Sequence, residues 1–222
     1  RAHLAACSSL WVSNSFIATT YERELDDDGT LEKDVVKRER VYSRGEERRA
    51  FLEAMWENGE PVPPQKLAAH QAKREKERRK REKDDQKEGA KEKDRSFGIL
   101  EPFETAHTGD YDFPSVAADT VDSVPAWRIE VSPRRESEEL VRGRAWVEQG
   151  SLRAIAEEYE PAKLPGKVHG MTMRIKGGST DPGCPYPRHM VLRAHGRALI
   201  FMKFRFEVEV GLDSVQVNPD LP

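Results

Sequence analysis

The feature that most constrains the fold is a run of strict alternation near the C-terminus. Every second residue from 198 to 210 is apolar, and from 203 onward the residues between them are charged. The apolar positions are Ala198, Ile200, Met202, Phe204, Phe206, Val208 and Val210; the charged ones are Lys203, Arg205, Glu207 and Glu209. Successive side chains of a β-strand point to opposite faces, so this period of two predicts a strand with one apolar and one wet face. Such strands are typical of antiparallel sheets.

Weaker patterns predict further strands along the chain. The first runs from Ser15 to Leu25, and the turn 26–30, made of aspartates, a glycine and a threonine, returns the chain into a second strand through Val35 and Tyr42. A third, 50–56, ends at the hairpin-type turn Asn58-Gly59. Later strands are expected at 115–120, 127–131, 140–148, 152–159 and 168–176, followed by a pair formed by 189–195 and the alternating run. Turns are expected at 121–124 and 149–151, and the Gly- and Pro-rich segment 177–187 is expected to be a loop.

The segment 61–95 is expected to be an inserted helix. Its prolines at 61, 63 and 64 break the sheet and suit a first helical turn, and strong helix formers follow to about residue 88. After Ala72 the segment has no apolar stripe. A helix that is polar all round projects into water, lies across a polar surface or frays.

Charge is distributed unevenly along the 222 residues. Residues 66–95 hold thirteen basic and eight acidic side chains, which leaves 24 of the 37 basic and 32 of the 40 acidic residues for the rest of the chain. The near-neutral total therefore hides an acidic body with a basic arm. The arm could meet anionic lipid or nucleic acid, although a solvated helix face explains it more simply. No nucleic-acid partner is expected, because acids interleave with the basic residues and the arm has no aromatic side chain for base stacking.

The fold class predicted is mainly β (α+β): a curved antiparallel sheet or incomplete β-barrel with one long, highly charged inserted helix. Residues 1–14 are an N-terminal lead-in, 15–60 a first β-meander, 61–95 the helix insertion and 96–222 the remainder of the sheet. The segments 15–60 and 96–222 are expected to form one domain.

Sequence motifs for catalysis, cofactors and metals are missing. Gly177-Gly178-Ser179-Thr180-Asp181 approaches the esterase elbow but lacks its final glycine. Phosphate-binding glycine motifs and H-E-x-x-H do not occur, and the six histidines are scattered. Cys184, His189 and His195 lack a fourth partner at metal-ligand spacing. We expect no enzyme, no cofactor and no metal site.

The chain termini and cysteines allow several readings. No run of 18 apolar residues occurs, so no transmembrane segment is expected. The first residue is Arg1, which is expected of a processed form or a fragment. Leu4-Ala5-Ala6-Cys7 reads like a lipoprotein cleavage box, but Arg1 and His3 stand where an apolar signal core should lie. Cys7 and Cys184 could form a disulfide in an oxidising compartment.

The order of elements carries a resemblance to a known family. Tyr21-Glu22-Arg23-Glu24 precedes an acid-rich turn, and a strand ends at Asn58-Gly59 before the proline-led charged helix. Then come the run Pro125–Arg134 (PAWRIEVSPR) and the run Arg142–Val147 (RGRAWV). This succession, over roughly residues 15–66 and 111–210, resembles the bacterial outer-membrane lipoprotein-sorting proteins, relatives of the LolA/LolB carriers. The resemblance implies a curved, incomplete barrel in the periplasm that shelters acyl chains in an apolar hollow.

Two departures from that family stand out. The segment 66–95 is too polar for a lid that packs into an apolar hollow, and only residues 1–14 and 96–110 remain as candidates to cover the sheet. No lipid-handling residue of the carriers can be matched to a position in this chain. Ordinary core packing explains the large apolar residues of the sheet about equally well.

We therefore expect a periplasmic or cell-envelope protein that holds the acyl chain of a lipoprotein or another lipid. The residues expected to line its apolar face are Trp127, Ile129, Trp146, Met171, Met173, Met202, Phe204 and Phe206. The alternative is a non-enzymatic envelope scaffold with a packed core, which uses the charged helix or an exposed edge to bind protein partners. A cavity lined by these residues would favour the carrier, and close packing would favour the scaffold.

Overall fold

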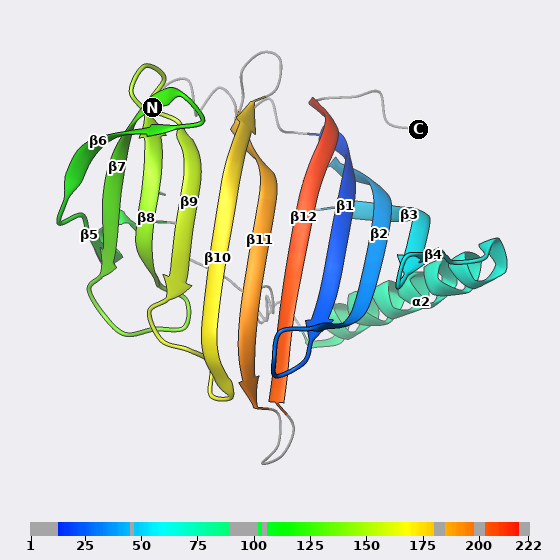
Figure 1. The fold of residues 1–222 in the computed structure, drawn as a ribbon. Coiled ribbons are helices and arrows are strands. Elements are labelled where there is room, and N and C mark those ends of the chain that lie inside the picture. Colours follow the sequence, from blue (N-terminus) through cyan, green and yellow to red (C-terminus); the bar gives the residue numbers. More distant parts are fainter. Residues whose placement is uncertain are drawn as a thin grey trace.

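A single curved antiparallel sheet dominates the fold (Figure 1). The computed structural model describes residues 13–44, 47–88, 102–103, 106–179, 185–197 and 203–217, with the backbone alone at 81–88 and 185. The strands are β1 (Ser13–Leu25), β2 (Leu31–Arg44), β3 (Glu47–Glu57), β4 (Glu60–Pro61), β5 (Tyr111–Asp112), β6 (Val116–Val121), β7 (Val124–Pro133), β8 (Val141–Glu148), β9 (Ala154–Pro161), β10 (Val168–Ser179), β11 (Pro185–Arg197) and β12 (Lys203–Val217). The helices are α2 (Pro64–Glu88) and the 3₁₀ turn η1 (Thr108–Asp110).

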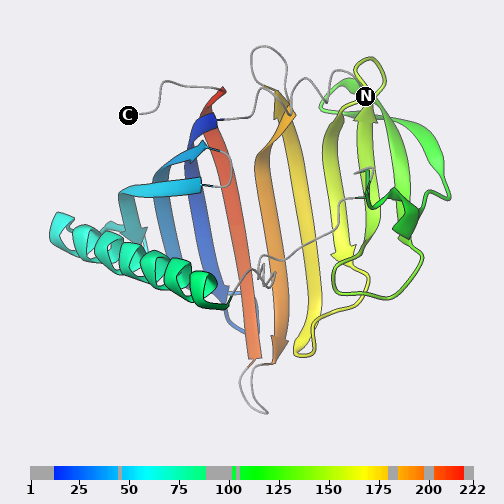
Figure 2. The same cartoon turned by 180° about the vertical axis from the view of Figure 1, so that it is seen from behind.

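Most neighbouring strands of the sheet are also consecutive in the chain, and one pairing joins the first strand to the last. The strands are arranged β4-β3-β2-β1-β12-β11-β10-β9-β8-β7-β5, and β6 also pairs with β7. Strands β1 and β12 are neighbours, so the first meander and the last hairpins share one sheet. The sheet curves but does not close, because β3 and β4 lie at one end and β5 and β6 at the other (Figure 2). The predicted fold class, a curved antiparallel sheet with one inserted helix, is confirmed.

Two predicted hairpin turns have the backbone that their residues favour. Asn58 and Gly59 have φ of 51° and 82°, and Asp122 and Ser123 have φ of 48° and 68°. Positive φ at both central residues matches the right-handed twist of the flanking strands. Asn58 is further anchored to Asp34: its backbone N–H donates to the Asp34 carbonyl at 2.8 Å, and its Oδ1 accepts from the Asp34 N–H at 2.9 Å.

The predicted loop over 177–187 is wrong at both ends. Strand β10 continues to Ser179 and β11 begins at Pro185, with Gly177 paired to Pro187. A Cβ at Gly177 would lie 2.8 Å from the Ala154 carbonyl oxygen, so this glycine lets β9 approach rather than breaking the strand. The expected strand positions Ala198, Ile200 and Met202 lie outside the described residues.

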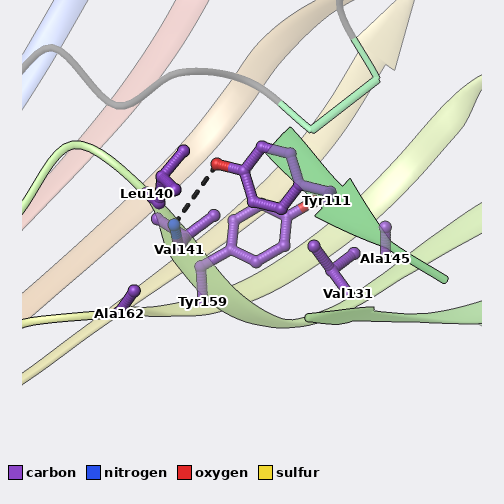
Figure 3. Close-up of a cluster of buried hydrophobic side chains, with 7 residues drawn as sticks. All are labelled: Tyr111, Val131, Leu140, Val141, Ala145, Tyr159 and Ala162. Atoms are coloured by element: carbon purple, nitrogen blue, oxygen red, sulfur yellow. Dashed lines mark hydrogen bonds between the residues drawn. The ribbon is translucent and has the colours of Figure 1, made fainter. Parts of the chain in front are cut away.

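Buried apolar side chains form a main cluster (Figure 3), and its residues come from the β9–β8–β7–β5 end of the sheet and the loops beside it. Its members are Tyr111, Val131, Leu140, Val141, Ala145, Tyr159 and Ala162, with Phe113 and Met173 packed against it. The Tyr111 hydroxyl accepts a hydrogen bond from the buried Val141 N–H at 3.3 Å, and burial raises the pKa of this phenol. The tyrosine thereby fastens the short strand β5 to the beginning of β8.

Helix α2 lies over the opposite end of the sheet, on its concave side (Figure 2). Leu67, Gln71, Glu75 and Arg78 are half-buried, at spacings that place them on one helix face. The Gln71 side chain accepts from the Leu52 N–H at 3.1 Å and donates to the Ala50 carbonyl at 3.3 Å, so it satisfies backbone groups of β3. A helix that is polar all round was expected to project into water, to lie across a polar surface or to fray. In the structure, the part of α2 around Gln71 lies across a polar surface.

Candidate ligand-binding face

The register of the central strands sorts their side chains onto two faces. Residues directly opposite each other in an antiparallel pair point to the same side. Three rows run across β10, β11 and β12 on the concave side: Met171–Ala194–Phe206, Met173–Leu192–Val208 and Ile175–Met190–Val210. All nine side chains are apolar. We call this set the apolar patch; from strand spacing it measures roughly 10 by 14 Å between outermost Cα positions.

Most of the apolar patch is only partly covered by described residues. Met171 and Ala194 are buried, with 7% and 4% of their surface exposed, and the other seven side chains are half-buried. Phe206 also stacks on Phe204, with ring centroids 6.0 Å apart and an interplanar angle of 22°. The patch is thus neither a dry core like that around Tyr111 nor a fully exposed surface.

The two flanks of the patch differ in chemistry. Toward β9 the row of Met173 continues to Tyr159, a member of the main buried cluster. Toward β1 the same row continues from Val208 to Glu22, which accepts from Lys37 at 2.6 Å. A cleft of about 360 Å³ opens on that charged flank beneath α2. Its lining is Thr20, Glu22, Lys37, Glu39, Leu52 and Met55 from the sheet and His70, Lys73, Arg74 and Glu77 from the helix.

The convex side of the same strands carries charge ladders. Glu207 accepts from Arg23 at 2.6 Å and from Arg193 at 2.5 Å. Burial acts to raise the pKa of Glu207, but these two hydrogen bonds outweigh it and the pKa is lowered. Glu158 accepts from Arg144, which chiefly lowers its pKa, and from Arg174 at 2.6 Å. The convex side is therefore the wet face, as the alternation of the last strand predicts.

Six of the eight residues predicted to line the apolar face have register positions on the concave side. Met171, Met173, Phe204 and Phe206 come together on β10 and β12. Trp127 and Ile129 lie on the same side but on β7, at the far end of the sheet, where Trp127 is 39% exposed. The other two predicted residues are Trp146 and Met202, and Met202 lies outside the described part of the chain.

The prediction for Trp146 is wrong. Its register partners Arg128 and Ala156 and its neighbour Arg144 place it on the convex side. The indole N–H donates to Asp119 at 2.9 Å, and the Arg144 guanidinium lies 5.4 Å from the ring centroid. Size and hydrophobicity suggested an inward side chain, whereas the period of two on β8 assigns the concave side to the small, fully buried Ala145. We therefore leave Trp146 out of the site.

The sequence predicts a strand over 189–195, but none of its residues was expected on the apolar face. Met190, Leu192 and Ala194 of β11 alternate with His189, Val191, Arg193 and His195. The period of two was present, but the apolar residue Val191 among the charged ones weakens it. Because β11 pairs with β10 on one side and β12 on the other, the register places Met190, Leu192 and Ala194 on the concave side.

The described residues contain no group of three or more His, Cys, Asp or Glu side chains arranged to hold a metal ion. Within the same part of the chain, no helix has the length and apolar character needed to cross a membrane. Cys7 and Cys184, which could form a disulfide, both lie outside the described residues.

The sequence matches no protein-family model and no curated protein. Among solved structures, it is similar to a LolA superfamily protein from Nitrosomonas europaea, at 14% identity and a TM-score of 0.42, covering 100% of this chain and 94% of that one. It is also similar to a putative outer membrane lipoprotein-sorting protein domain from Vibrio parahaemolyticus, at 11% identity and a TM-score of 0.45, covering 98% and 92%. A DUF1329 family protein from Desulfovibrio piger has 11% identity and a TM-score of 0.41, with 99% and 92% covered.

Proposed function

We propose that this protein is a non-enzymatic binding protein of the periplasm or cell envelope, which holds the acyl chain of a lipoprotein or another lipid on the apolar patch. The observation that carries the proposal is the patch itself. It is nine apolar side chains in three contiguous rows, seven of them half-buried, on the concave side of an open sheet. An apolar surface of this kind is favourable to cover, and an acyl chain is a cover without polar requirements.

The chemistry of the patch suits binding rather than catalysis. Its side chains are methionine, leucine, isoleucine, valine, alanine and phenylalanine, which supply neither a nucleophile nor a proton donor. Each CH₂ group of a ligand that leaves water contributes about 0.8 kcal/mol. Because methionine adapts its shape to irregular partners, Met171, Met173 and Met190 suit ligands of varied length and branching.

Titration of the delipidated protein with a fluorescent acyl probe tests the proposal. Adjacent residues on β12 provide a matched pair of variants: Phe206 lies on the concave side and Arg205 on the convex side. Phe206→Gln removes apolar contact worth about 1.5–3 kcal/mol, so the probe should bind roughly 10- to 100-fold more weakly. Arg205→Gln should leave the affinity unchanged. Urea unfolding of both variants separates lost binding from lost folding.

Competition identifies the ligand class. An acylated peptide should displace the probe, and the same peptide without its acyl chain should not. If the wild-type protein shows no saturable binding, or if both variants bind the probe equally well, the carrier function is wrong. The envelope scaffold with a packed core would then be the better account.

A further inference from the structure

Helix α2 carries a row of exposed lysines about half a turn round the helix from its packed face, and one of them, Lys73, also borders the cleft beneath the helix. The half-buried positions Leu67, Gln71 and Glu75 face the sheet. Lys66, Lys73 and Lys80 are seven residues apart, so at 3.6 residues per turn they lie almost on one line, and Lys76 lies beside that line. We call these four the lysine row. It extends about 21 Å along a rigid helix.

The charges of the lysine row are available to a partner. All four side chains are exposed, and none forms an ion pair with another described residue. The arginines of the helix differ, because Arg74 pairs with Glu39 while Arg78 and Arg79 pair with Glu75. Arg78 and Arg79 lower the pKa of Glu75 to about 2, so this acid is committed to them and does not neutralise the lysines.

The row also sits on the basic pole of an acidic molecule. Residues 66–80 contain seven basic and two acidic side chains. Outside residues 66–95, acids outnumber bases by 32 to 24. A charge separation of this kind turns the molecule in the field of an anionic surface, so that α2 approaches first and the acidic body points away.

We propose that the lysine row docks the protein onto the anionic headgroups of a lipid membrane. A straight row on one helix face fits a flat surface, and the small side chains of Ala69 and Ala72, both exposed between the lysines, allow the helix to approach closely. Charge attraction is sufficient, because Lys residues near an anionic bilayer each add to membrane binding. Nucleic acid is the less suitable occupant, since residues 64–80 contain no Phe, Tyr or Trp on which a base could stack. The proposal is independent of what the apolar patch binds.

Co-flotation of the full chain with lipid vesicles tests the docking. The probes are phosphatidylcholine vesicles with and without phosphatidylglycerol, at about 0.1 M and about 1 M salt, where the Debye length falls from roughly 10 to 3 Å. The test variant is K73Q/K76Q/K80Q, which keeps good helix formers in α2. The control is K163Q/R197Q/R205Q, which removes the same net charge at exposed positions away from α2.

Wild type and control should float with phosphatidylglycerol vesicles at low salt and be released at high salt. The test variant should bind roughly a hundredfold more weakly, about fivefold for each lysine removed. Equal loss in both variants would show that net charge alone matters and would overturn the proposal. Failure of the wild type to bind would also overturn it, as would duplex DNA displacing the protein from the vesicles. None of these outcomes bears on acyl-probe binding, which is measured without vesicles.

Discussion

Removal of one hydroxyl group tests how the main buried cluster is held together. Tyr111 is 1% exposed, and its hydroxyl is the acceptor for the Val141 N–H at 3.3 Å. In Tyr111→Phe the ring stays and leaves no large cavity, but the buried N–H loses this acceptor. An unsatisfied buried donor costs about 1–3 kcal/mol. With an m-value of about 2–3 kcal/mol/M, the urea midpoint should fall by roughly 0.5–1 M at unchanged slope.

The matched control is Tyr186→Phe, which removes a hydroxyl from a half-buried tyrosine of β11. The Tyr186 ring packs near Gly178 and its hydroxyl forms no hydrogen bond with another described residue, so the expected change is within about 0.5 kcal/mol. Urea unfolding followed by tryptophan fluorescence measures both variants. Equal midpoints for the two variants would refute the reasoning, because the hydrogen bond would then contribute no more than a surface hydroxyl.

Three further predictions concern the edges and charges of the sheet. Glu158→Gln should destabilise the protein by less than about 1 kcal/mol near pH 7. Because folding lowers the pKa of Glu158, the stability that its carboxylate contributes is present above the ordinary glutamate pKa of about 4.3 and is lost as the pH falls through the lower folded value. The urea midpoints of wild type and Glu158→Gln should therefore converge in acid. Gln71→Ala should leave the Leu52 amide without its acceptor, and hydrogen exchange of that amide should accelerate severalfold or more, whereas no acceleration would show that Gln71 does not protect the edge of β3. Asn58→Ala, at φ of 51°, should lower the urea midpoint by an amount corresponding to about 1–2 kcal/mol and Asn58→Gly by less, the reverse order being incompatible with a strained turn.

The fold was largely predictable because the strongest local patterns agree with the tertiary arrangement. The alternation from Lys203 to Val210 appears as the concave and convex sides of β12. Asn58-Gly59 and Asp122-Ser123 form turns, because their residues tolerate the positive φ that tight hairpins need. The charged helix begins where proline suits a first turn, at Pro64.

The candidate site was predictable only in part, since facing depends on register rather than on residue size. Trp146 is large and apolar, yet one position on β8 places it among arginines while Ala145 is buried. Gly177 signals a loop in isolation, but in the sheet it makes room for the backbone of β9. The residues that β11 adds to the apolar patch are identified by its pairing with β10 and β12, and that pairing cannot be read from the sequence alone.

Photo-crosslinking with a fatty acid that carries a diazirine in its acyl chain tests the central claim most directly, because mass spectrometry then maps where the chain lies. The proposed function predicts crosslinks on residues of the apolar patch, such as Met173, Leu192 and Val208, and their loss when an acylated peptide competes. Crosslinks spread over the convex side, at Trp146 or among the charge ladders, and unaffected by the competitor would contradict it.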